Sequence, residues 1–144
     1  MSLEILEAKE EIRELIDTFS NYECDVHAQA PLFTEDTHVM VYMGGQLAMD
    51  IHGSGELEKQ FSAFTVGVKA SHHMNGQQVI VLNGKEETDT HYCRAALLTA
   101  EGGKEYISDN YIRYVDTLVR VEGKWKIKVR EQHFLITEKR EVNK

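Results

Sequence analysis

The sequence predicts a single α+β domain in which helices near the start of the chain pack on a strongly curved antiparallel sheet. Helical spacing of apolar residues is confined to the first half of the chain, and strand-like runs dominate the second half. Two-residue hairpin signals such as Asn83-Gly84 separate the later strands. Helices followed by a meander of strands are typical of the α+β class, and long strands must coil, which gives a cone that can enclose a small molecule.

Three helices are predicted. The first covers residues 3–24, where apolar side chains recur every three or four positions behind Ser2, the expected N-cap. The second is a short helix over residues 28–33, and the third covers residues 55–65 with Ser54 as its expected cap.

The strands follow from apolar runs bounded by glycine-containing turns. They are predicted over residues 37–42, 47–52, 73–82, 88–100, 106–121 and 125–136. One domain over residues 1–137 is therefore expected, followed by a charged and frayed tail over residues 138–144.

Composition excludes several classes of protein. A formal net charge of −8 at pH 7 argues against binding to nucleic acid or to anionic membranes. The acidic start does not resemble a signal peptide, and no apolar run approaches the ~20 residues of a membrane span. A cytoplasmic protein is the expectation, with Cys24 and Cys93 as small buried side chains rather than a disulfide.

Sequence motifs give no support to nucleotide, dinucleotide or serine-hydrolase chemistry, because none of their glycine-rich or serine signatures is present. The seven histidines show no spacing typical of metal ligands. Neither a metal nor a cofactor is therefore expected.

Asp25 and His73 are the first candidates for acid–base chemistry. Asp25 follows the first predicted helix, and His73 begins the first long strand. A carboxylate that orients an imidazole and stabilises its cation is a common general-base unit. Each residue also has an ordinary alternative, Asp25 as a solvated helix end and His73 as a surface or core histidine. Adjacent strand residues face opposite sides, so at most one of His72 and His73 faces the interior.

Tyrosines are the second group of candidates. Tyr42, Tyr92 and Tyr114 lie on three different predicted strands, and a phenol can donate a hydrogen bond to a developing oxyanion. Aromatic side chains are equally typical of ordinary sheet packing. Asp116 shares a strand face with Tyr114, so both residues line a cavity or both lie on the outer face of the sheet. Tyr22 is the last residue of the apolar stripe of the first helix.

Several stretches together resemble one known family. They are FTEDT at 33–37, HGSG at 52–55, SHHMNG at 71–76, YVDTLVR at 114–120 and GKWKI at 123–127. In these stretches the chain resembles the SnoaL-like branch of the nuclear transport factor 2-like superfamily, which includes scytalone dehydratase, ketosteroid isomerase and polyketide cyclases. The resemblance implies a cone-shaped, barrel-like cystatin-like fold, with three N-terminal helices on the curved sheet, and a homodimer formed through the outer face of that sheet.

The resemblance also implies roles for particular residues. Asp25 and His73 stand where dehydratase-type members carry an acid and a histidine, and Tyr42 stands where scytalone dehydratase has a solvent-activating tyrosine. Tyr92 and Tyr114 replace a histidine and an asparagine of that enzyme. These correspondences make Asp25, His73 and Tyr42 the expected catalytic residues, with His73 facing the cavity and His72 facing outward or toward a partner subunit. Substrate-binding residues are expected at Tyr22, Tyr92, Tyr114 and Asp116.

Two functions remain open from the sequence. The first is a cofactor-independent dehydratase, isomerase or cyclase that uses an Asp–His dyad on a small, mostly apolar cyclic substrate. The second is a non-catalytic ligand-binding or assembly module of the same fold, which the loss of polar partners at Tyr92 and Tyr114 favours.

Overall fold

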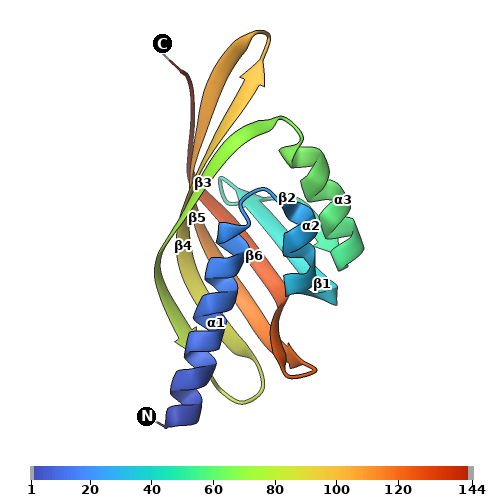
Figure 1. Ribbon diagram of the computed structural model, residues 1–144, viewed down its shortest axis with the longest axis vertical. Coiled ribbons are helices and arrows are strands. Elements are labelled where there is room, and N and C mark those ends of the chain that lie inside the picture. Colours follow the sequence, from blue (N-terminus) through green and yellow to red (C-terminus); the bar gives the residue numbers. More distant parts are fainter. Residues whose placement is uncertain (1, 143–144) are drawn as a thin grey trace.

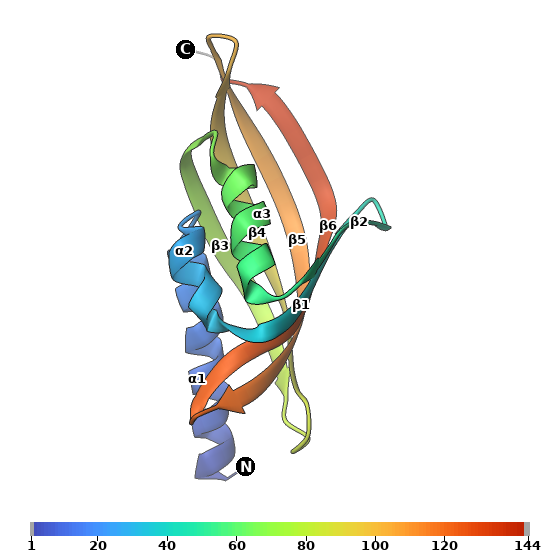
Figure 2. The same ribbon diagram turned by 90° about the vertical axis from the view of Figure 1, so that its right-hand side faces the viewer.

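Six strands form one curved sheet in the order β2-β1-β6-β5-β4-β3. The computed structural model describes residues 2–142. All neighbouring strands are antiparallel except β1 and β6, which are parallel. The strands are β1 Phe33–Met43, β2 Gln46–His52, β3 Val68–Val81, β4 Glu87–Glu101, β5 Lys104–Val121 and β6 Lys124–Glu141. The predicted α+β class and the strong curvature are confirmed, and β2 and β3 remain free edges, so the sheet does not close into a barrel (Figures 1 and 2).

The helices cover the concave face of this sheet (Figure 2). They are α1 Leu3–Asn21, α2 Val26–Gln29 and α3 Ser54–Thr65, with a short 3-10 turn, η1, at Ala30–Leu32. α1 packs against β3 and β6, whereas α3 packs against β1 and β2. Among residues 2–142, no helix combines the length and the apolar character needed to cross a membrane.

The core lies between α1 and the centre of the sheet. Its buried side chains include Ile12, Ile16, Phe19, Val39, Ile51, Leu118 and Ile127. On the strands they alternate with outward-facing residues, as the period of two requires. The same cluster includes Leu57 of α3, so α1 and α3 both pack on the sheet through it.

Helix ends differ from the sequence prediction by a few residues. The Ser2 hydroxyl caps α1 as predicted, accepting a hydrogen bond from the Ile5 amide at 3.3 Å. α1 ends at Asn21 rather than at residue 24, because Glu23 takes a left-handed conformation with φ of 56°. The second helix starts at Val26, two residues earlier than predicted, since the Asp25 side chain caps it.

The C-terminal strand is longer than the sequence indicated. β6 continues to Glu141, which pairs with Tyr106 of β5, and Lys139 forms an ion pair with Glu101 at 2.9 Å. Charged residues 138–141 are therefore part of the sheet, because the ladder to β5 satisfies their backbone groups whatever their side chains. Residues 143–144 of the predicted tail lie outside the described residues.

The turn into α3 requires a glycine, which gives a first stability prediction. Gly53 precedes α3 with φ of 92° and ψ of 145°, a conformation that costs other residues about 1–3 kcal/mol. Gly53→Ala should therefore lower the free energy of unfolding by about that amount, measured by urea denaturation. Gly55→Ala is the matched control, because Gly55 lies inside the helix with open space around it and should gain up to about 1 kcal/mol. If the free energy of unfolding changed in the same direction in both variants, the requirement for glycine at position 53 would be contradicted.

Candidate active site

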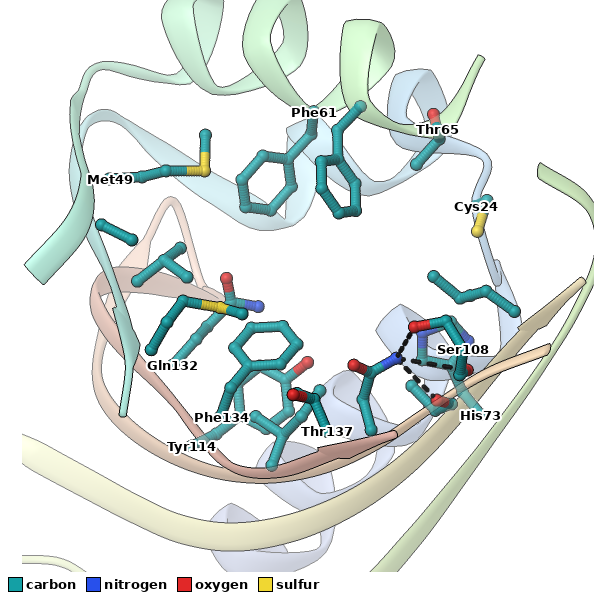
Figure 3. A pocket seen from close by; sticks show the side chains of 18 of the residues that line it. Cys24, Met49, Phe61, Thr65, His73, Ser108, Tyr114, Gln132, Phe134 and Thr137 are labelled. Carbon is teal, nitrogen blue, oxygen red and sulfur yellow. Dashed lines mark hydrogen bonds between the residues drawn. The ribbon is translucent and has the colours of Figure 1, made fainter. Parts of the chain in front are cut away.

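A cavity of about 630 Å³ lies between the helices and the concave face of the sheet (Figure 3). Its walls are mostly apolar, and it includes side chains from α3, β2 and β6 that face one another across the space. These wall residues include Val41, Met49, Phe61, Phe64, Leu97 and Phe134. A few polar groups converge on it, among them Glu23, His73, Asn110, Tyr114 and Gln132. An apolar cavity of this size with few polar groups is typical of a small-molecule site.

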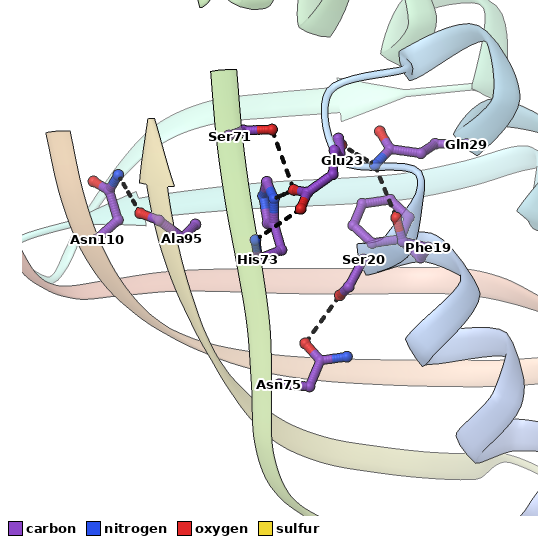
Figure 4. A network of polar contacts seen from close by, with 9 residues as sticks. All are labelled: Phe19, Ser20, Glu23, Gln29, Ser71, His73, Asn75, Ala95 and Asn110. Atoms are coloured by element: carbon purple, nitrogen blue, oxygen red, sulfur yellow. Dashed lines mark hydrogen bonds and ion pairs between the residues drawn. The ribbon is translucent and has the colours of Figure 1, made fainter. Parts of the chain in front are cut away.

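His73 and Glu23 form the acid–base pair of the cavity. The Glu23 carboxylate bonds Nδ1 of His73 and also accepts hydrogen bonds from the His73 amide at 3.1 Å and the Ser71 hydroxyl at 3.2 Å (Figure 4). The side chain of His73 is 13% exposed and that of Glu23 is 34% exposed. With three bonds to one carboxylate, both the imidazole ring and the carboxylate are held in fixed orientations.

The turn after α1 positions Glu23. Its left-handed backbone directs the chain away from the helix axis and brings the side chain across to β3. The buried Gln29 amide secures this turn by donating to the carbonyl oxygens of Phe19 at 3.0 Å and Glu23 at 2.6 Å. A non-glycine residue at positive φ is strained by about 1–3 kcal/mol, and such strain is often found at functional sites.

Strand β3 positions His73. Period-two alternation makes Ser71, His73 and Asn75 face the helices, while His72 is exposed on the other side. Asn75 ties the strand to α1, since it accepts from the Ser20 hydroxyl at 2.9 Å and donates to Asp17 at 2.8 Å. The structure therefore confirms that His73 points inward and that His72 points outward.

The protonation pattern of the pair suits a general base. Burial acts to raise the pKa of Glu23, but the hydrogen bonds and charge of His73 outweigh it, and the pKa lies below its ordinary value of 4.5. The ionised carboxylate at Nδ1 favours the His73 tautomer with its proton on that nitrogen. Within residues 2–142, no hydrogen bond occupies Nε2, which leaves its lone pair free for a substrate proton.

Asp25 does not pair with His73, which corrects the dyad expected from the sequence. Its Oδ1 atom accepts from the Ala28 amide at 3.2 Å, and the residue is exposed at the start of α2. The left-handed residue Glu23 reverses the chain two positions before Asp25, so the earlier acid reaches β3 and the later one caps the next helix. In the sequence, the only sign of this pairing was that the stretch Glu23-Cys24-Asp25 holds two acids. Helical periodicity does not show which of the two acids reaches His73.

Three of the predicted tyrosines lie away from the cavity. Tyr42 is on the outer face, where it stacks on His133 with ring centroids 4.7 Å apart. Tyr92 also faces outward and is 37% exposed, and Tyr22 is 41% exposed at the end of α1. The cavity-facing residues of β1 are instead Val41 and Met43. β1 is apolar at both parities, so its sequence alone does not show which face is inside.

Tyr114 lines the cavity as predicted. It is buried, and burial raises the pKa of its phenol well above the ordinary value, so it remains a hydrogen-bond donor at neutral pH. Its ring stacks on His91 with centroids 4.8 Å apart. The phenol is therefore held rigidly at the floor of the cavity.

Asp116 lies beneath Tyr114 in a buried ion pair rather than at the cavity surface. Arg130 donates two hydrogen bonds of 2.8 Å to its carboxylate, and both side chains are fully buried. The guanidinium is also 4.2 Å from the centre of the Phe19 ring and 4.5 Å from that of Tyr114. Asp116 thus supports the floor of the cavity and is not one of the residues that line it.

Asn110 is a cavity residue that the sequence analysis missed. It is buried, and its amide nitrogen donates to the Ala95 carbonyl at 3.1 Å and the Ser108 hydroxyl at 3.2 Å. Alternation on β5 places Asn110, Ile112 and Tyr114 on one face. Because Tyr114 was a candidate cavity residue, the even spacing between it and Asn110 could have identified Asn110 from the sequence.

The two cysteines are free, as expected. Burial raises the pKa of Cys93 to about 11. Burial also raises the pKa of Cys24, and the neighbouring Glu23 charge adds to this effect. A hydrogen bond with Ser71 acts in the opposite direction but does not outweigh them. Both thiols are therefore protonated at neutral pH, and the Cys24 thiol is a poor nucleophile although it lines the cavity.

The fold and the cavity define a small α+β protein whose curved sheet encloses an acid–base pair. Residues 4–131 match the SnoaL-like domain, and the chain belongs to that family. No curated protein matches the chain.

Three solved structures illustrate the likeness in fold. A protein named as a candidate scytalone dehydratase from Novosphingobium aromaticivorans is 23% identical, with a TM-score of 0.79 over 96% of this chain and 91% of that one. A hexachlorocyclohexane dehydrochlorinase, LinA type 2, is 12% identical, with a TM-score of 0.78 over 98% and 93%. A nuclear transport factor 2-like protein with a cystatin-like fold from N. aromaticivorans is 23% identical, with a TM-score of 0.61 over 92% and 85%. These likenesses establish the fold, and the resemblance inferred from the sequence is confirmed.

Proposed function

We propose that this protein is an enzyme that removes a proton next to a carbonyl group of a small, mostly apolar cyclic molecule, with His73 as the base and without a cofactor. One observation carries the proposal. The His73 imidazole has an ionised carboxylate on Nδ1 and an unoccupied Nε2 at an apolar cavity. A positioned general base of this kind contributes about 10²–10⁴-fold to a rate.

The reaction we propose is an elimination of water. Nε2 of His73 takes the proton from the carbon beside the carbonyl, and Glu23 stabilises the imidazolium that forms. The Tyr114 phenol donates to the developing oxyanion. The electron pair then expels the β-hydroxyl, which leaves as water after taking the proton back from His73, and the product is the unsaturated ketone. Two of the similar structures carry the names of a dehydratase and a dehydrochlorinase, which favours elimination over isomerisation or cyclisation.

The proposal is tested with a panel of bicyclic β-hydroxy ketones. Wild-type protein should convert at least one to the unsaturated ketone, followed by ultraviolet absorbance, or exchange its α-proton in D₂O, followed by proton NMR. His73→Ala should lower the turnover by about 10²–10⁴-fold because the base is lost. His72→Ala is the matched control, since this neighbouring histidine is exposed on the opposite face of β3 and should leave turnover unchanged. Full activity in His73→Ala would exclude the mechanism.

Ligand binding without catalysis is the second candidate function. The positions of Tyr22, Tyr42 and Tyr92 outside the cavity favour it, because three phenols fewer than expected are available to act on a substrate. A carrier would bind apolar ketones with an affinity that does not change between pH 5 and 8, and it would release them unaltered.

We also propose that two copies associate through the outer face of the sheet. Val79, Tyr92 and Tyr111 all lie on that face and are more than a third exposed. Exposed apolar side chains on a sheet face are typical of an interface, and symmetric dimers are the commonest oligomers.

A further inference from the structure

His38, Asp50 and His52 form a cluster on the outer face of the β1–β2 hairpin, away from the cavity. His38 and His52 are cross-strand partners, and their rings stack with centroids 4.2 Å apart and planes 16° apart. Asp50 is two residues before His52 and therefore lies on the same face of β2. The histidines come together only through the register of the hairpin, so their spacing in the sequence gave no sign of the cluster.

The three ligand atoms of the cluster lie close together. Oδ1 of Asp50 is 2.5 Å from Nε2 of His38 and 3.6 Å from Nε2 of His52. All three ligand atoms lie within 4.8 Å of one another. Ligands on a tetrahedral zinc ion are about 2.0–2.2 Å from the metal, which sets them roughly 3.4 Å apart. The separations are therefore close to those of a coordination sphere, which the three atoms would form once the stacked rings rotate toward one ion.

We propose that His38, Asp50 and His52 bind a divalent transition-metal ion of the zinc type, with solvent completing the coordination. Two imidazole nitrogens select this class of metal over Mg²⁺ or Ca²⁺, which prefer oxygen ligands. The His52 side chain is 70% exposed and that of Asp50 is 46% exposed, so an ion reaches the site from solvent without any opening of the fold.

Two other histidines, His27 and His133, each form an ion pair with one carboxylate. His27 pairs with Glu58 at 2.6 Å, and His133 pairs with Glu131 at 2.9 Å. Over the described part of the chain, only the His38 cluster brings three ligand atoms of this kind together. The third ligand atom therefore distinguishes the His38 cluster from an ordinary pair of a histidine and a surface acid.

A metal at this site would fasten the edge strand β2 to β1 (Figure 2). Met49, the neighbour of Asp50, faces the opposite side of β2 and forms part of the cavity wall. The ion would therefore stabilise one wall of the cavity while it remains outside the cavity itself. This inference does not depend on the function proposed for His73.

The test is calorimetric titration of chelator-treated full-length protein with zinc chloride at neutral pH. Wild-type protein should bind one equivalent, and His52→Ala should weaken binding by at least about tenfold, since even the loss of a group that supports a metal ligand costs about 10–100-fold. His27→Ala is the matched control, because it removes an exposed histidine beside a carboxylate and should leave the zinc affinity unchanged.

Thermal unfolding provides a second readout. Zinc at a hundred times the wild-type dissociation constant should raise the melting temperature of wild-type protein by about 5–10 °C, and that of His52→Ala by about half as much or less. Absence of saturable zinc binding, or equal binding by wild-type protein and His52→Ala, would overturn the proposal. Equal weakening by His27→Ala and His52→Ala would also overturn it, by showing that binding is not specific to the cluster.

Discussion

Replacing Arg130 with alanine is expected to lower the free energy of unfolding by about 3–5 kcal/mol, the usual cost of removing one partner of a buried ion pair. Arg130 and Asp116 are both fully buried and share two hydrogen bonds of 2.8 Å. Burial acts to lower the pKa of Arg130, but the charge of Asp116 outweighs it and the pKa is raised. Without the guanidinium, the buried Asp116 carboxylate loses both of these hydrogen bonds and keeps Nδ1 of His91 at 3.9 Å. It must then either remain charged in a dry site without its strongest partner or take up a proton.

Arg94→Ala is the matched control for this prediction. Arg94 makes the same two-bond contact with Asp109, at 3.0 and 2.7 Å, but its side chain is 51% exposed. Exposed pairs contribute about 0.2–1 kcal/mol, so the control should lose no more than that in urea denaturation. A double variant, Arg130→Met with Asp116→Leu, should recover much of the lost stability because it removes both charges. Equal losses in Arg130→Ala and Arg94→Ala would refute the role of burial.

Glu23→Gln is expected to lower turnover by about 10²–10⁴-fold on the substrate that the ketone panel identifies. Glutamine has the size of glutamate, but it has no charge with which to stabilise the imidazolium of His73 or to fix its tautomer. Asp25→Asn is the control, because asparagine is an equally good helix cap and Asp25 lies outside the cavity. A loss confined to Asp25→Asn would restore the dyad expected from the sequence.

The stability of Glu23→Gln measures the contribution of the Glu23–His73 contact without any substrate. The pKa of Glu23 is lowered in the folded protein, so its contribution to stability is fully present above its ordinary pKa of 4.5 and is lost as the pH falls through the folded value. Glu23→Gln should therefore be less stable than wild-type protein at neutral pH, with a gap that narrows below about pH 4.5. Urea denaturation across the acidic range measures this difference, and a gap independent of pH would contradict it.

Local patterns in the sequence were sufficient for the fold class and for much of the element order. The N-cap Ser2 and the helical stripe of α1 act between residues that are close in the chain. The Asn83-Gly84 signal correctly placed a turn, although five residues, 82–86, rather than two separate β3 from β4. The resemblance to the family, together with strand alternation, also placed His73 inward. These features depend on periodicity and on short-range hydrogen bonds, which a sequence displays directly.

Tertiary structure alone decided which side chains meet. The left-handed turn at Glu23 gave His73 its partner, and the buried parity of β1 put Val41 rather than Tyr42 at the cavity. The register of the β1–β2 hairpin likewise set His38 opposite His52. Each outcome depends on one backbone conformation or on a one-residue choice of register, and such a choice reverses which face a side chain occupies without changing the pattern of the sequence.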